Sequence, residues 1–311
     1  MKEDLATFLK GFAMGAANVV PGVSGGTIAF ITGIYERLIE ALKALDGKAL
    51  RMAGTLRFRA LWVQVDGRFL TALGVGVVVS IVSLARVLEW AFAEHPKVVW
   101  ALFLGLIAAS IPALAKTVRK WSAGSMVALL LGLGIAVSMA FLTPGTPSEN
   151  WFYLGLCGVA GICSMIIPGL SGSFVLLLMG NYALILGSVN ELSSGNVSGA
   201  MKVILPVGLG AIAGLLVLSR FLSWLFKAHH NTAVAAITGF VAGSLVIIWP
   251  WKDTLVAKVI KNGEETEKII GFSNWRWPDF SSGSVWMEMA ALILGVLLIL
   301  VVDRFDQTEK V

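Results

Sequence analysis

Apolar segments follow one another along almost the whole chain, and they come in two lengths. Six are long enough to approach the roughly 20 residues that a membrane-spanning helix needs, and they lie at 69–93, 98–115, 125–142, 203–227, 232–249 and 285–302. Four shorter segments form two pairs, 7–20 with 27–42 and 151–167 with 174–189. A Pro-Gly-x-Ser-Gly turn joins each pair, which predicts two re-entrant hairpins, 7–42 and 151–189, covered by protein or by a water-filled cavity.

The second half of the chain repeats the first. One block aligns PGVSGGTIAFITGIY (21–35) with PGLSGSFVLLLMGNY (168–182), and another aligns LGVGVVVSIVSLARVLEWAFAEH (73–95) with VGLGAIAGLLVLSRFLSWLFKAH (207–229). The offset falls from 147 to 134 residues because the loop 43–68 occurs only in the first half. Chance apolar similarity would not keep Arg, Trp and His in step, so we interpret 1–148 and 149–311 as a duplication.

Each half contains one hairpin and three spans, which is an odd number of crossings. The second half must therefore enter the membrane from the opposite side, and the predicted fold is an all-α polytopic membrane protein built as an inverted repeat. The basic loops 43–68 and 116–120 and the stretch 143–150, which has no Lys or Arg, fit a cytoplasmic N-terminus. The C-terminus is then predicted to be cytoplasmic as well.

Composition supports a membrane protein and argues against a soluble one. The chain is 57% hydrophobic and 14% charged, whereas soluble domains carry about 25% charged residues. The net charge of +5 is explained by cytoplasmic basic loops and anionic membrane lipids, so no nucleic acid is expected as a partner. We expect a multi-pass protein of the bacterial inner (plasma) membrane.

Small polar residues and glycines follow both Pro-Gly turns, where half-helices are predicted to begin. The first N–H groups of a helix have no partner within it and carry partial positive charge, and glycine lets an anion approach the backbone. One such turn would be only a kink. Here two half-helix starts, which we call the tips of the hairpins, meet from opposite sides and predict a site for phosphate or carboxylate. The candidate residues are Ser24, Gly25, Gly26, Thr27, Ser171, Gly172 and Ser173.

Two arginines occupy matching positions inside predicted spans. Arg86 and Arg220 lie about 10 Å from the ends of their helices at a rise of 1.5 Å per residue. Because a charge in lipid is costly, both are candidates for holding an anionic head group. The alternatives are snorkelling to the membrane surface and, for Arg86, pairing with Glu89 one turn away, a partner that Ser223 replaces beside Arg220.

Glu36 and Arg37 have no charged counterpart in the second hairpin, where Ala183 and Leu184 take their places. This asymmetry suggests that Glu36, Arg37 and Glu89 act in gating or in proton coupling; an interfacial ion pair is an equal alternative.

Histidine and cysteine are too scattered to predict a metal site. His95, His229 and His230 lie at membrane edges, and Cys157 and Cys163 lie six residues apart in an apolar stretch. We expect edge histidines, free thiols and no metal or cofactor.

The stretch GAANVVPGVSGGTIAFITGIYERLIEAL (15–42) resembles the signature of the PopT family, formerly a membrane family of unknown function, and IPGLSGSFVLLLMGNY (167–182) extends the resemblance. This similarity implies a polyprenyl-phosphate transporter. It implies a flippase that returns undecaprenyl phosphate, the lipid carrier of cell-wall (peptidoglycan) synthesis, from the outer to the inner leaflet.

The two lines of reasoning agree, because only the phosphate head of such a lipid must be shielded from hydrocarbon while its tail stays in the membrane. We therefore predict a lipid transporter and not an enzyme, since no nucleophile, base and metal occur together. A small-anion channel or ion-coupled carrier is the alternative, and a lipid-phosphate phosphatase is a weaker one. A lateral opening would favour the flippase, and an enclosed aqueous pore the channel. Proton or cation coupling and a homo-oligomer remain open.

Overall fold

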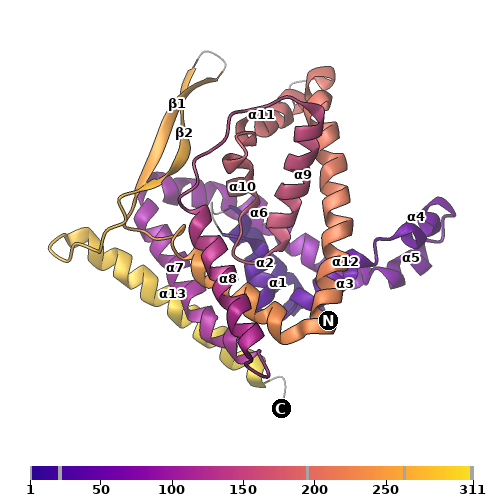
Figure 1. Ribbon diagram of the computed structural model, residues 1–311, viewed down its shortest axis with the longest axis horizontal. Coiled ribbons are helices and arrows are strands. Elements are labelled where there is room, and N and C mark those ends of the chain that lie inside the picture. The colour runs from indigo at the N-terminus through magenta and orange to yellow at the C-terminus, as the bar shows by residue number, and fades with distance from the viewer. Residues whose placement is uncertain (1, 20–22, 194–195, 262–263, 309–311) are drawn as a thin grey trace.

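The computed structural model describes residues 2–19, 23–193, 196–261 and 264–308, and these are mostly helical (Figure 1). The first half contains α1 (Lys2–Val19), α2 (Gly25–Ile31), α3 (Tyr35–Lys43), α4 (Gly47–Gly54), α5 (Phe58–Gln64), α6 (Gly67–Glu94), α7 (Pro96–Lys116) and α8 (Ala123–Met139). The second half contains α9 (Trp151–Ile166), α10 (Gly172–Leu178), α11 (Tyr182–Ser193), α12 (Val197–Ser244), β1 (Asp253–Lys261), β2 (Glu264–Ser273) and α13 (Gly283–Thr308).

Long apolar helices make the chain a multi-pass membrane protein. Four of the described helices, α6, α7, α12 and α13, are long and apolar enough to cross a membrane. The predicted span 125–142 corresponds to the shorter helix α8. The predicted span 203–227 and most of the predicted span 232–249 lie in α12, which ends at Ser244. Its backbone leaves helical geometry at His229, with φ −138° and ψ 49°. The fold is thus a polytopic helical protein, as the apolar pattern predicts.

Both predicted half-helices begin where the Ser-Gly motifs place them. Helix α2 starts at Gly25 after Ser24, and α10 starts at Gly172 after Ser171. Each then breaks a second time, which the sequence analysis did not predict: 27–42 and 174–189 are not single segments. The breaks occur at Gly33 and Gly180, whose φ angles of 70° and 78° favour glycine. The axes of α10 and α11 differ by 118°.

Glycines allow the long helices to touch backbone to backbone. A Cβ atom at any of these glycines would overlap a carbonyl oxygen of the neighbouring helix, as small residues at membrane-helix interfaces permit. The contacts join α1 to α6 (Gly76), α9 to α12 (Gly158, Gly210), α7 to α13 (Gly105, Gly295) and α8 to α12 (Gly132, Gly239). The last span of each half therefore packs against the other half, which interlocks the two halves.

Two loops contain elements that the apolar pattern missed. The loop 43–68 forms the short helices α4 and α5, and the long loop 250–284 contains the antiparallel pair β1–β2, which projects from the helices (Figure 1). Asn-Gly between two strand-like runs typically marks a tight hairpin. That dipeptide stands at 262–263, outside the described residues. The fold is thus helical with one small sheet.

We expect Gly210→Ala to lower the melting temperature of the purified protein, because the added methyl group must displace the carbonyl group of Gly155. Overpacking of this kind typically costs about 1–3 kcal/mol. Gly208→Ala is the matched control, since a Cβ there meets nothing within 4 Å. Equal melting temperatures for the two variants would contradict close packing of α9 on α12.

Candidate functional site

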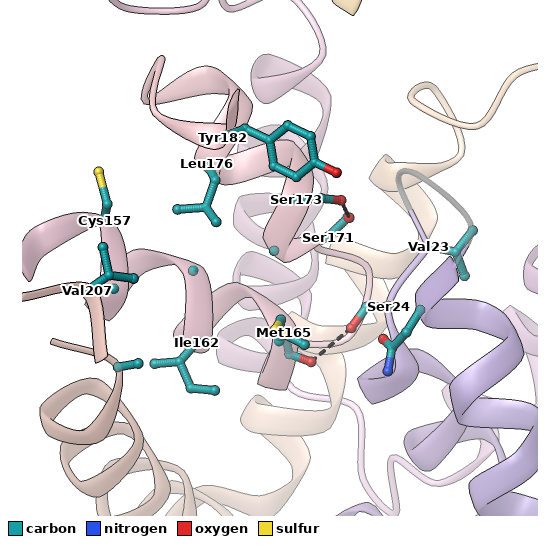
Figure 2. A pocket seen from close by; sticks show the side chains of 15 residues that line it. Val23, Ser24, Cys157, Ile162, Met165, Ser171, Ser173, Leu176, Tyr182 and Val207 are labelled. Atoms are coloured by element: carbon teal, nitrogen blue, oxygen red, sulfur yellow. Dashed lines mark hydrogen bonds between the residues drawn. The ribbon is translucent and has the colours of Figure 1, made fainter. Parts of the chain in front are cut away.

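A cavity of about 320 Å³ lies between the tips of the two hairpins. Most of its wall comes from α9, α10 and α12, and the first hairpin supplies one edge (Figure 2). The polar residues at its wall are Asn18, Ser24, Ser171, Ser173 and Tyr182; Gly158, Gly161 and Gly172 add bare backbone, and the remainder are apolar or Cys157. The structure thus brings the two predicted tips to one cavity.

The first tip uses its helix-end donors inside the protein. The hydroxyl of Ser24 accepts a hydrogen bond from the Gly26 amide at 3.1 Å, and the Gly25 amide donates to the Asn18 side-chain oxygen at 2.8 Å. The Thr27 amide donates to the Ser24 carbonyl at 2.9 Å. The sequence predicted that these amides would be available to an anion, and in this structure all three have partners.

Two hydrogen bonds join the first tip to the second hairpin. The Ser24 hydroxyl donates to the Met165 carbonyl at 2.9 Å, as Figure 2 shows, and the buried Thr27 hydroxyl accepts from the Gly169 amide at 2.7 Å. Gly26 faces the same segment, because a Cβ there would come within 2.5 Å of the Ile166 carbonyl oxygen. Thr27 and Gly26 therefore support the cavity from behind, and Ser24 alone of the four predicted residues of this tip lines it.

The second tip faces the cavity with its polar groups. Ser171, Gly172 and Ser173 all line it. The two serine hydroxyls lie 2.9 Å apart and bond to each other, and neither caps the start of α10. Figure 2 shows Tyr182 directed toward this serine pair. This tip therefore offers hydroxyl donors and an uncapped helix end, which suit an oxyanion.

Formal charge is absent from the described residues that line the cavity. Arg220 lies elsewhere on α12, where its exposed guanidinium donates to the Leu216 carbonyl at 2.7 Å. The cavity meets α12 at Val207 and Ala211, at least two helical turns away. The structure thus does not bring Arg220 to the tips. The side chains of Arg86 and Glu89 lie outside the described part of the structure.

Glu36 and Arg37 do not pair with each other in this structure. The Arg37 guanidinium bonds to Asp66 at 2.7 Å and to Glu3 at 3.0 Å, which fastens α3 to its own half. Glu36 points the other way, and its carboxylate lies 3.5 Å from the ring nitrogen of His230 on α12. Glu36 and Arg37 are adjacent in sequence, but Arg37 contacts residues of the first half and Glu36 contacts α12.

A polar cluster continues this contact between α3 and α12. The Ser223 hydroxyl donates to the Glu40 carboxylate at 2.6 Å, the Lys227 ammonium lies 3.0 Å from the same carboxylate, and the Lys43 ammonium donates to Ser223 at 2.8 Å. We call Glu36, Glu40, Lys43, Ser223, Lys227 and His230 the α3–α12 clasp. Sequence reasoning missed Glu40, Lys43 and Lys227, although the spacing 36, 40, 43 places three charges on one helix face.

The second hairpin cannot form the same clasp. Residues 183 and 187 stand at the positions that correspond to Glu36 and Glu40, and they are Ala183 and Gly187. Neither side chain can form an ion pair. At these two positions, therefore, the second hairpin lacks the carboxylates with which the first hairpin contacts α12.

His95 and His229 occupy equivalent bends in the backbone. Their backbone angles nearly coincide, at φ −136° and ψ 53° for His95 and φ −138° and ψ 49° for His229. Each ring packs edge-on against a tryptophan, Trp90 or Trp224. Within the described residues no three His, Cys, Asp or Glu side chains gather into a possible metal site, and Cys157 and Cys163 are free thiols.

Comparison with known proteins gives the family. The model of the undecaprenyl phosphate translocase-like family matches residues 14–266. The chain belongs to this family. The translocase-like chain is 35% identical over 306 residues to a polyprenyl-phosphate transporter of Vibrio cholerae, covering 97% of both chains. It is 28% identical over 257 residues to one of Staphylococcus aureus, covering 78% of this chain and 85% of the relative. No solved structure gives a significant match.

Family membership confirms the resemblance carried by residues 15–42 and 167–182. It also places this translocase-like chain among transporters and not among enzymes.

We expect Thr27→Val to destabilise the protein, because the Gly169 amide would lose its partner in a buried place. An unsatisfied buried donor costs about 1–3 kcal/mol. Thr238→Val is the control, since Thr238 is equally buried but its hydroxyl only donates to Val234, one turn back in the same helix. Thermal unfolding in detergent measures the stability of both variants. A larger loss of stability for Thr238→Val than for Thr27→Val would refute a stabilising hydrogen bond between the hairpins.

Proposed function

We propose that this protein is a flippase that carries undecaprenyl phosphate from the outer to the inner leaflet of the bacterial inner membrane, for reuse in cell-wall synthesis. The observation that carries the proposal is the cavity between two interrupted hairpins, where Ser171, Ser173 and Tyr182 present hydroxyl groups. Interrupted helices at matching positions are the usual place of a transporter's substrate site. The names of the relatives in Vibrio and Staphylococcus agree with this substrate.

The proposed architecture is an inverted repeat of two re-entrant hairpins, each followed by three spans, with both termini in the cytoplasm. Three pairs of equivalent residues support it. Gly33 and Gly180 share positive φ angles, His95 and His229 share backbone angles, and Gly76 and Gly210 each allow close contact with the first helix of their own half. Symmetry of this kind lets one site face either side of the membrane by exchanging the conformations of two similar halves.

The phosphate head would bind at the second tip. Hydroxyl groups of Ser171 and Ser173 can donate to phosphate oxygens after their mutual bond breaks, and the N-terminal end of α10 adds favourable backbone dipoles. Gly172 lets this tip pack closely on α9, because a Cβ there would come within 2.5 Å of Met165 and 3.0 Å of the Gly161 carbonyl oxygen. Ser24, Gly25, Gly26 and Thr27 would take the corresponding role when the first tip is released from its internal hydrogen bonds.

Arg220 enters the proposal from outside the cavity, and Arg86 is proposed to take the matching part in the first half. Arg220 is exposed on the outer face of α12, where lipid surrounds the protein. An arginine there can attract a phosphate head along the path to or from the cavity. Its guanidinium would exchange the carbonyl of Leu216 for a phosphate oxygen.

The α3–α12 clasp defines the side on which the protein is closed. With the N-terminus inside, the clasp lies at the cytoplasmic end and the cavity belongs to the external side. The proposed cycle takes up the lipid head from outside, opens the clasp, and releases the head inside. Glu36 and Glu40 are the gating residues, and Glu36 with His230 is the pair through which a proton could be coupled to opening.

Leaflet-resolved transport in proteoliposomes tests the proposal. Undecaprenyl phosphate is placed in one leaflet, and its accessibility to an added phosphatase is followed over time. We expect wild type to move it and the Ser171→Ala, Ser173→Ala double variant to bind it about tenfold or more weakly, because hydrogen bonds to a charged group are lost. Ser138→Ala is the control, since Ser138 bonds only within α8.

Two outcomes would contradict the flippase. Equal affinity of wild type for undecaprenyl phosphate and the matching polyprenyl alcohol would show that the tips do not recognise phosphate. If the protein passes inorganic phosphate or chloride, and undecaprenyl phosphate does not inhibit that passage, the result would favour the small-anion channel or carrier.

We further expect Glu40→Ala to open the cytoplasmic end, because Lys227 and Ser223 both lose the same partner. Spin labels on Lys48→Cys and Ala228→Cys, two exposed positions on either side of the clasp, measure the opening in a variant with Cys157 and Cys163 replaced by Ala. We expect a longer mean distance or a second, longer population. Glu3→Gln is the control, since it weakens an ion pair within the first half; a matching change there would refute gating by the clasp.

A further inference from the structure

The hydroxyl group of Tyr35 is buried without a partner. The side chain is 2% exposed, and its oxygen finds no hydrogen-bond partner among the described residues. The ring lies edge-on between Phe30, with ring centres 5.3 Å apart, and Phe226, at 5.7 Å. Buried tyrosine hydroxyls normally have a partner. A hydroxyl that is not needed for this conformation points to a role in another one.

Tyr182 is the equivalent residue of the second hairpin. Each tyrosine stands eleven residues after the serine of its tip, Ser24 or Ser171, and each is the first residue of the helix that follows a glycine with positive φ. Their surroundings differ completely, because Tyr182 lines the cavity beside the serine pair (Figure 2). One tyrosine hydroxyl is thus presented to the cavity while its counterpart is covered.

Phe226, which covers Tyr35, has a counterpart in the first half that lies in different surroundings. Phe226 lies against Tyr35, within the surface that the α3–α12 clasp holds shut. The aligned residue in the first half is Phe92, which packs against Trp100 with ring centres 5.5 Å apart. Exchanging the two arrangements would uncover Tyr35 and bring Phe92 over Tyr182.

We propose that Tyr182 and Tyr35 bind the lipid phosphate in turn, Tyr182 in the present conformation and Tyr35 after the clasp opens. The proposal rests on the proposed function and adds to it the two residues that hold the head on either side. A phenol hydroxyl donates to a phosphate oxygen on each occasion. In the present conformation the Tyr35 hydroxyl is unsatisfied, which destabilises this conformation relative to the one in which the hydroxyl binds phosphate.

The third tyrosine of the chain allows a matched experiment. Tyr153 donates to the Met179 carbonyl at 2.8 Å and does not line the cavity. Each of Tyr35→Phe, Tyr182→Phe and Tyr153→Phe removes one oxygen atom. The measurements are the melting temperature without lipid, the affinity of the detergent-solubilised protein for undecaprenyl phosphate, and leaflet-resolved transport of that lipid in proteoliposomes.

We expect Tyr35→Phe to raise the melting temperature by about 2 °C, to leave affinity within about twofold, and to slow transport by about tenfold. Tyr182→Phe should weaken affinity by about tenfold without a gain in stability. Tyr153→Phe should lower the melting temperature and transport normally.

The results separate this inference from the proposed function. If wild type neither binds nor moves undecaprenyl phosphate, the proposed function fails. If wild type moves it and Tyr35→Phe moves it equally fast, the role of Tyr35 is refuted. A lower melting temperature for Tyr35→Phe together with slow transport would also refute it, because a merely structural hydroxyl would give that result.

Discussion

The structure depends on the need to satisfy backbone polar groups where the helices break inside an apolar protein. A continuous membrane helix meets this need by itself, but a break leaves amides and carbonyls without helical partners. Here the first break is closed across to the second hairpin, through Ser24 to the Met165 carbonyl and from the Gly169 amide to Thr27. The breaks thus stabilise each other, and this pairing brings residues 141 and 142 positions apart to one site.

The same constraint explains why the two tips differ although their sequences are similar. Asn18 accepts the Gly25 amide, and Ser24 accepts the Gly26 amide, so the first tip is satisfied by its own hairpin. At the second tip the serine hydroxyls bond to each other and, among the described residues, to no other group. Under the proposed function, a phosphate head would replace this one hydrogen bond and accept a bond from each of the two hydroxyls. The two tips therefore differ in which of their donors are already bonded within the protein. This difference fits the proposed function, in which the two tips bind the head group in turn.

Much of this arrangement follows from local sequence rules. The helix starts at Gly25 and Gly172 were predicted because a Pro-Gly turn breaks each apolar stretch just before the Ser-Gly pair. The breaks at Gly33 and Gly180 were missed, because apolar residues on both sides hide a glycine whose φ angle is set by tertiary packing. Internal use of the Gly25 and Gly26 amides could not be foreseen, since it depends on how the Asn18 and Ser24 side chains are oriented at the turn. Arg220 shows the converse limit: its sequence position gives its depth in the helix, but the direction it faces depends on how α12 packs.

The contacts of the α3–α12 clasp are suited to being broken. The side chains of Glu40 and Lys227 are 45% and 65% exposed, and exposed ion pairs contribute only about 0–1 kcal/mol each. In the proposed cycle, a few such contacts would bias two conformations by a factor on the order of ten to a hundred, which the binding of one phosphate head would overcome. Deeply buried ion pairs would hold α3 and α12 together too firmly, because breaking them leaves uncompensated charge. The clasp therefore suits the proposed cycle, in which it favours one of two conformations and still lets the other form.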